Sequence, residues 1–225
     1  MVFWGMRIVA VADTHTLEKN LGALPDGDVF VHAGDMLWGG TLEELERVAK
    51  WIRGLPHRHK VVIAGNHDWC FVNEPAAARA LLGDVIYLQD SGVTLHGLRL
   101  WGSPWQPVFH DWAFNLPRGA AIAERWACIP DGVDVLITHG PPLGFGDRVH
   151  DEARVGCEDL LDRVRQVQPR LHLFGHIHQD GGSWREGATC FANVTAWECE
   201  RSATVLDIDP SSREVLEVAV PPRDT

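Results

Sequence analysis

The sequence predicts an α/β protein in which mixed β-sheets are flanked by helices. Apolar runs of strand length, rich in Val, Ile and Leu, alternate with amphipathic stretches along the chain. Short strand-like segments separated by turns become more frequent in the second half. The chain has 225 residues, 45% of them hydrophobic, and it lacks a Pro- or Ser-rich linker. We therefore expect one domain over residues 1–225.

Five segments have the composition of buried strands. Each is a nearly continuous apolar run, which is typical of a strand covered on both faces of its sheet. These segments are residues 6–13, 28–35, 60–68, 133–140 and 170–178.

Three amphipathic stretches between the strands are expected to form helices. They are residues 41–53, 117–127 and 156–169. The first begins with Thr41 and Glu44 at the spacing of a capping box, and its apolar residues recur on one face. The last places its apolar residues on one stripe and is closed by Pro169.

Two further segments are predicted to be β-hairpins. Residues 84–105 combine short alternating runs with glycine turns, and residues 203–220 contain two runs joined by DPSS.

Charge and cysteine content narrow the class of protein. The net charge of -11 argues against a sequence-independent grip on nucleic-acid backbone, although bound cations would leave a nuclease possible. The five cysteines contain no CxxC pair, which predicts reduced thiols in a cytoplasmic protein. The apolar start, MVFWGMRIVAVADTH, is too short to span a membrane and lacks a cleavage site. We expect no membrane partner; the oligomeric state stays open.

Each of the five predicted strands ends in residues that can bind a metal ion. In open α/β sheets, ligands bind beyond the carboxyl ends of the strands, so these endings are expected to converge. Glycines beside them allow the backbone to approach an ion closely. The candidate ligands are Asp13 and His15, Asp35, Asn66, His139, and His176 and His178.

The ligand types favour two transition-metal ions. Two aspartates, one asparagine and four histidines, without a thiolate, suit Mn²⁺, Fe, Co, Ni or Zn²⁺ better than Mg²⁺ or Ca²⁺, and we favour Mn²⁺. Seven ligands exceed one tetrahedral shell, which favours two ions that share a carboxylate. Such ions, about 3.5–4 Å apart, activate a bridging hydroxide and hold a phosphoryl group. Each short motif alone is more often an ordinary turn; all five together favour the metal site.

The remaining histidines and tryptophans are weaker candidates. His32 is expected to be a core residue or a partner of a ligand, whereas His57 and His59 lie in a polar segment and are expected to be solvated. We interpret His96, His110 and His172 as structural and leave His150 open. Trp105 and Trp112 are candidates for the wall of a substrate pocket, with Asn115 as a polar contact.

The order DxH, GD, GNHD, H and GHxH over residues 13–178 resembles the calcineurin-like metallophosphoesterase superfamily. The stretches WIRGLPHRHKVVIAGNHD, GSPWQPVFHDWAFNLPRG and LITHGPPLGFGD are similar to its small metallophosphoesterase-domain-containing (MPPED-type) branch. This resemblance implies a four-layer α/β/β/α sandwich and hydrolysis of phosphoesters at a dinuclear centre. It implies two ligand groups bridged by Asp35: Asp13, His15 and His178 for one ion, and Asn66, His139 and His176 for the other.

The resemblance also implies roles for the residues after Asn66. His67 is expected to contact the phosphoryl oxygens or protonate the leaving group, with Asp68 orienting it, and water on the metals attacks. A non-catalytic binding module on the same fold is the alternative, but such a module has no need of His67 or of a complete ligand set.

The substrate is expected to be a small phosphodiester, of the cyclic or small nucleotide type. Protein Ser/Thr phosphatases have GDxVDRG where this chain has GDMLWGG, so the arginine that grips a phosphate dianion is missing. An arginine from a distant loop, such as Arg118 or Arg148, would reverse this preference and favour a phosphomonoesterase.

Overall fold

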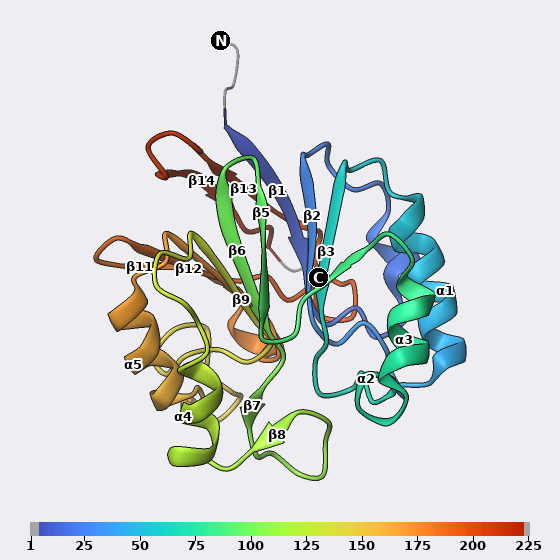
Figure 1. The fold of residues 1–225 in the computed structure, drawn as a ribbon, viewed down its shortest axis with the longest axis horizontal. Helices are drawn as coiled ribbons and strands as arrows, with labels where there is room; N and C mark the ends of the chain where they lie inside the picture. Colours follow the sequence, from blue (N-terminus) through green and yellow to red (C-terminus); the bar gives the residue numbers. More distant parts are fainter. Residues whose placement is uncertain (1–4, 223–225) are drawn as a thin grey trace.

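The computed structural model describes residues 5–222 and arranges them as two six-stranded mixed sheets that face each other (Figure 1). The first four and last three residues of the predicted domain lie outside the described range. The predicted architecture of mixed sheets flanked by helices is confirmed.

The first sheet has the order β14-β13-β1-β2-β3-β4. The strands β1 to β4 run parallel, while β13 and β14 form the predicted C-terminal hairpin, in which β13 is antiparallel to β1. The bounds are β1 Met6–Val11, β2 Val29–Ala33, β3 His59–Ile63, β4 Ile86–Tyr87, β13 Thr204–Ile208 and β14 Val215–Ala219.

The second sheet has the order β11-β12-β10-β9-β6-β5. Its four central strands are parallel, and both edge strands are antiparallel to their neighbours. Within the segment 84–105, predicted to be a hairpin, β5 and β6 form the hairpin. The bounds are β5 Ser91–Leu95, β6 Leu98–Ser103, β9 Val135–Thr138, β10 Leu171–Phe174, β11 Gly182–Glu186 and β12 Thr189–Asn193. A separate short pair consists of β7 Gln106–Pro107 and β8 Asn115–Leu116.

Helices cover the two outer faces, so that the molecule has four layers (Figure 1). The apolar residues between the sheets, such as Ile8 and Ile63 from one and Leu100 and Ile137 from the other, form a single cluster. The helices are α1 Leu42–Gly54, α2 Cys70–Asn73 and α3 Pro75–Leu82 on the first sheet, and α4 Ala120–Trp126 and α5 Glu158–Val167 on the second. Two 3₁₀ turns are η1 Glu18–Leu21 and η2 His178–Asp180. Within the described range no helix has the length and hydropathy needed to cross a bilayer.

Helix α1 forms as the sequence predicts. Thr41 Oγ1 accepts a hydrogen bond from the Glu44 amide at 3.2 Å, and the Glu44 carboxylate accepts one from the Thr41 amide at 3.3 Å. This capping box satisfies amides that the first turn leaves without partners. Leu45, Val48 and Ile52 then face the sheet and are buried.

Two local expectations are wrong. The helix predicted from residue 117 begins only at Ala120, because Gly119 has a φ of +82° and cannot be part of it. His57 is buried rather than solvated, because its Nε2–H donates to the carbonyl of Pro25 at 3.1 Å. Both features depend on backbone conformation or on a distant partner, so the local sequence does not reveal them.

The parallel strands bring their carboxyl ends to one edge of the molecule. The strands β1, β2 and β3 are neighbours in one sheet, and β9 and β10 are neighbours in the other. The two sheets are joined at this edge, since Ala12 after β1 pairs with Thr195 after β12 and its amide donates to the Val194 carbonyl at 3.0 Å. The five predicted ligand-bearing ends therefore meet here.

Candidate metal centre

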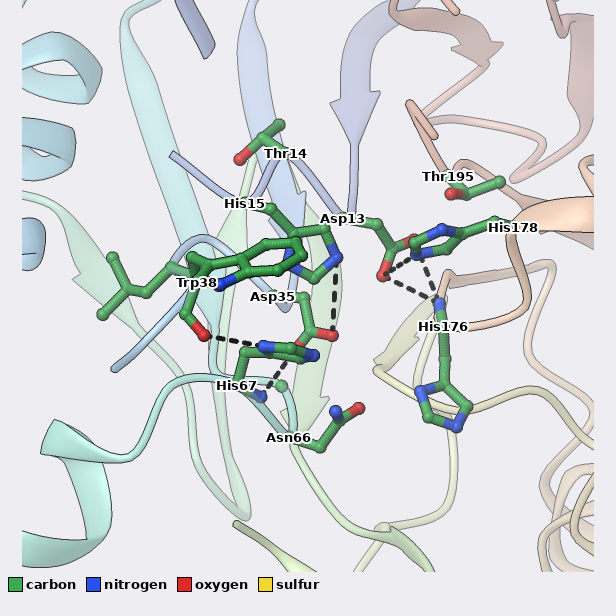
Figure 2. Close-up of polar contacts among 12 residues, drawn as sticks. Asp13, Thr14, His15, Asp35, Trp38, Asn66, His67, His176, His178 and Thr195 are labelled. Carbon is green, nitrogen blue, oxygen red and sulfur yellow. Dashed lines mark hydrogen bonds and ion pairs between the residues drawn. The ribbon is translucent and has the colours of Figure 1, made fainter. Parts of the chain in front are cut away.

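The structure brings all seven predicted ligands to this edge. Asp13, His15 and Asp35 come from the first sheet, and His176 and His178 from the second, with Asn66 below them (Figure 2). Three groups have ligand atoms within 4.8 Å of one another: Asp13, His15 and His178; Asp35, His139 and His176; and His15, Asp35 and His67. Asn66 joins the second of these, because its Oδ1 lies 2.9 Å from His139 Nε2.

The imidazoles are oriented by the backbone. His15 Nδ1–H donates to the carbonyl of Leu37 at 3.2 Å, and His139 Nδ1–H donates to that of Ala33 at 3.0 Å. In both rings Nε2 is thereby turned toward Asp35, at 4.0 Å and 3.3 Å from its Oδ2. A metal-binding histidine is commonly held in this way, because the hydrogen bond on one nitrogen leaves the other free for the ion.

The buried charges of this site fit a cation. Burial pushes the pKa of Asp35 up, but the charge and hydrogen bond of His139 outweigh it and hold the pKa below its ordinary value. Burial likewise disfavours the charged form of His139, yet Asp35 raises the pKa of His139 to about 9. A proton on His139 thus offsets the buried carboxylate, and a divalent ion bound by both groups would take the place of that proton.

Four of the ligands have an unusual backbone conformation. Asp13, His15, Asp35 and His176 all have a positive φ, between 45° and 70°. L-residues rarely adopt this region, and a cluster of such residues is a recurrent feature of functional sites. The surrounding hydrogen bonds hold them in place, for example from the Asp13 amide to Gly34 and from the His15 amide to Asp35.

Close packing at Gly65 provides a direct test of how tightly the site is built. A Cβ at this position would overlap the Asp35 carboxylate and lie 2.7 Å from His139 Cε1. We expect Gly65→Ala to cost roughly 1–3 kcal/mol of stability and to weaken metal binding, because Asp35 and His139 must both move. The control is Gly54→Ala at the end of α1, where a Cβ meets nothing within 4 Å. Thermal unfolding and metal content measure the effect, and equal metal content in both variants would contradict it.

His67 lies beside the ligands, and its ring is held by residues that are not themselves ligands. Its Nδ1–H donates to the main-chain carbonyl of Trp38 at 2.8 Å, and its amide donates to Asp35 Oδ1 at 2.8 Å (Figure 2). The ring packs on Trp112 at a centroid distance of 4.2 Å and lies 5.8 Å from Trp38. Sequence patterns do not point to Trp38, because a main-chain carbonyl does not depend on residue type.

Among the described residues, Asp68 is hydrogen-bonded through its carboxylate to backbone amides and not to the His67 ring. Its buried carboxylate accepts hydrogen bonds from the amides of Met36, Leu37 and Gly65, at 3.3, 2.9 and 2.8 Å. Asp68 thereby fixes the loop after β2, which contains Trp38. The orienting role of Asp68 stays a prediction, through the loop whose Trp38 carbonyl holds the His67 ring.

Trp105 and Asn115 have other contacts than those expected of substrate-binding residues. Trp105 Nε1–H donates to Asp90 at 2.8 Å, and the guanidinium of Arg125 lies 4.6 Å from its ring. Asn115 accepts a hydrogen bond from Gln106 and donates to the carbonyls of Phe109 and His110. Neither is among the described residues that line the pocket beside the ligands, and Asn115 instead holds the loop that carries Phe109.

Two other buried histidines support the ligand loops. His32 Nε2 is hydrogen-bonded to Thr14 at 2.9 Å, and His172 Nε2 to Thr138 at 2.8 Å. Thr14 lies between two ligands in the chain, and Thr138 directly precedes a third. Burial lowers the pKa of both imidazoles to about 3, so they are neutral. The sequence-based interpretation of His32 as a core residue agrees with this position.

A pocket of about 360 Å³ opens beside His176 and His178. Its wall includes Val108 and Phe109 from the loop between β7 and β8, and Arg118 also belongs to its lining. Arg118 donates to the carbonyls of Val155 and Gly156, each at 2.7 Å.

Sequence comparison connects this site with known proteins. The profile of the family described as calcineurin-like phosphoesterase matches residues 6–180. The chain is 46% identical over 214 residues to the human protein "Metallophosphoesterase domain-containing protein 1", covering 84% of this chain and 65% of the relative. The mouse protein of the same name matches equally well. This chain therefore spans slightly less than two thirds of the length of these relatives.

Structural comparison shows the same fold in more distant proteins. The protein TT1561 of Thermus thermophilus superposes with a TM-score of 0.64 at 16% identity, covering 96% of this chain and 99% of that one. A structure described as a novel archaeal phosphodiesterase superposes with a TM-score of 0.52 at 14% identity, with the same coverage of 96% and 99%.

Proposed function

The chain belongs to the calcineurin-like phosphoesterase family, and on this basis we propose that it hydrolyses phosphodiesters with two divalent metal ions. The observation that carries the proposal is the convergence of the seven ligands at one edge of the sheets, with His67 beside them. A non-catalytic module would need neither the complete set nor an imidazole fixed next to it. Small or cyclic nucleotide diesters are the favoured substrates, and Mn²⁺ is the favoured ion.

Each part of the site has a chemical task in this proposal. Two bound divalent ions would neutralise phosphoryl charge and lower the pKa of the attacking water. The new bond joins the water oxygen to phosphorus, the ester bond to the leaving oxygen breaks, and that oxygen takes up a proton. Because Nδ1 of His67 donates to Trp38, its Nε2 is the atom that can transfer this proton or hold a phosphoryl oxygen.

The diester preference is supported by what flanks the site. Trp38 and Trp112 lie at the His67 side, and Trp38 is 57% exposed, so its ring offers apolar surface there. The pocket lined by Phe109 lies at the other side, next to His176 and His178. A phosphoryl group between these walls would have an apolar surface for each of two ester arms.

A phosphomonoesterase is the second candidate, and Arg118 is the observation that favours it. Arg118 lines the pocket next to two ligands, so a guanidinium is present near the site although the segment GDMLWGG around Asp35 contains none. If it reached the phosphoryl group, it would offset the additional charge of a monoester dianion.

We expect kcat/KM to be higher for bis-p-nitrophenyl phosphate than for p-nitrophenyl phosphate, at equal Mn²⁺ load. The phosphoryl group of the diester carries one negative charge instead of two, and the segment GDMLWGG offers no arginine that would offset the second charge at this group. The comparison uses the same leaving group in both substrates. A clear advantage for the monoester would move the proposal to the second candidate.

A further inference from the structure

Exposed apolar side chains are concentrated at the mouth of the pocket beside His176 and His178. Val108, Phe109 and Val155 are 56%, 52% and 37% exposed, and all three line this pocket. Apolar surface gathered at a concave site is typical of a place that a ligand covers.

The pocket wall is held in shape by hydrogen bonds. Gln106 is buried, and its amide donates to the Ala113 carbonyl at 2.7 Å and to Asn115 at 3.0 Å. Asn115 in turn donates to the carbonyls of Phe109 and His110, each at 3.1 Å. These bonds fix the loop that carries Phe109, whose ring lies 6.0 Å from that of His176. The apolar wall is therefore positioned against a metal ligand.

Arg118 is the one arginine or lysine among the described residues that line the pocket, and no aspartate or glutamate lines it. Two of its N–H groups donate to the neutral carbonyls of Val155 and Gly156. A guanidinium has five N–H groups, so further donors remain, and no carboxylate in the described lining offsets its charge. The pocket thus combines an apolar wall, a cation and the edge of the metal site.

We propose that this pocket binds one ester arm of the substrate, and that this arm has a flat apolar body bearing an anionic group that pairs with Arg118. This inference rests on the proposed function and specifies its substrate class. The apolar body would lie against Phe109 and Val155, with the phosphoryl group at His176 and His178. Arg118 acts in it as a specificity-determining residue.

The test compares two diesters that differ by one carboxylate. They are p-nitrophenyl phenyl phosphate and p-nitrophenyl 4-carboxyphenyl phosphate, and release of both phenols is followed by liquid chromatography with Mn²⁺-loaded protein. Because Arg118 is exposed, we expect a preference of only about fivefold in kcat/KM for the carboxyphenyl ester. Arg118→Gln should abolish this preference, and Arg118→Lys, which keeps the charge, should retain part of it.

The matched control is Arg148→Gln. Arg148 is 52% exposed, pairs with Glu152 and does not line the pocket, so this variant should keep the wild-type preference. An unchanged preference in Arg118→Gln would overturn the proposal. The proposal would also be overturned if Arg118→Gln lowered kcat/KM only for the monoester p-nitrophenyl phosphate, since Arg118 would then contact the phosphoryl group itself.

A binding measurement separates this inference from the proposed function. Phenylphosphonate and 4-carboxyphenylphosphonate contain no ester bond, and isothermal titration into Mn²⁺-loaded protein compares their affinities. We expect the wild type to bind 4-carboxyphenylphosphonate about fivefold more tightly than phenylphosphonate. Arg118→Gln should bind both compounds with equal affinity. If the wild type hydrolyses no diester but shows this difference, the proposed function fails and the pocket assignment stands. Equal binding of both compounds to the wild type refutes the pocket assignment.

Discussion

Asp35→Ala is expected to abolish both metal binding and activity, whereas the wild type should bind close to two ions per chain. Asp35 Oδ2 lies 3.3 Å from His139 Nε2 and 4.0 Å from His15 Nε2, so its loss removes the carboxylate that lies between these two imidazoles and that we propose to bridge the ions. Exhaustive chelation of the wild type should have the same effect on activity, because the proposed attack on phosphorus depends on water activated by the ions.

Elemental analysis of Mn²⁺-loaded protein measures the ion content, and hydrolysis of bis-p-nitrophenyl phosphate measures the activity. Asp131→Asn is a suitable control, because its carboxylate is 92% exposed and belongs to none of the ligand groups found among the described residues. The two-ion proposal would be wrong if full activity survived chelation, or if Asp35→Ala kept both ions.

His67→Ala is expected to retain both ions and to lower kcat by about 10²–10⁴-fold, the usual contribution of general acid–base catalysis. Its ring is directed by Trp38 and packed on Trp112, so its loss leaves the seven ligands in place. The rate should recover little in His67→Gln, which can hold a hydrogen bond but cannot transfer a proton.

Metal content and kcat are measured for the same preparations, with His96→Ala as the control. His96 is exposed and packs on His59, away from the ligand groups. An empty site in His67→Ala would make His67 a ligand instead, and His67 does lie in a group with His15 and Asp35. Wild-type turnover would remove it from the mechanism altogether.

The sheets and the convergence of the ligands can be predicted from sequence, because both follow from local patterns. A buried strand is visible as an apolar run, and polar residues after Ala33, Ile63 or Thr138 must emerge at the same edge when the strands are parallel. Helix α1 is equally visible through its capping box. Helix α3, residues PAAARALL, is not recognisable in the same way, because an alanine-rich segment of eight residues has only a weak apolar stripe.

The finer arrangement of the site cannot be predicted, because it depends on contacts between distant residues. Asp68 follows His67 in the chain, but its carboxylate is bound by amides of the loop after β2. His67 depends on a carbonyl 29 residues away, and Arg118 reaches the pocket through bonds to residues 37 and 38 positions later. Residue types and spacing contain no information about these distances.

The left-handed conformation of Asp13, His15, Asp35 and His176 sets a trade-off between stability and function. Glycine would relieve the strain at each of these positions but would also remove a ligand, so a substitution that stabilises the backbone destroys the site. Aspartate and histidine tolerate this region better than most residues, which limits the cost without removing it. The scaffold must therefore be stable enough to hold four such residues before an ion arrives. Engineering for thermostability should accordingly begin in the outer helices and leave these four turns unchanged.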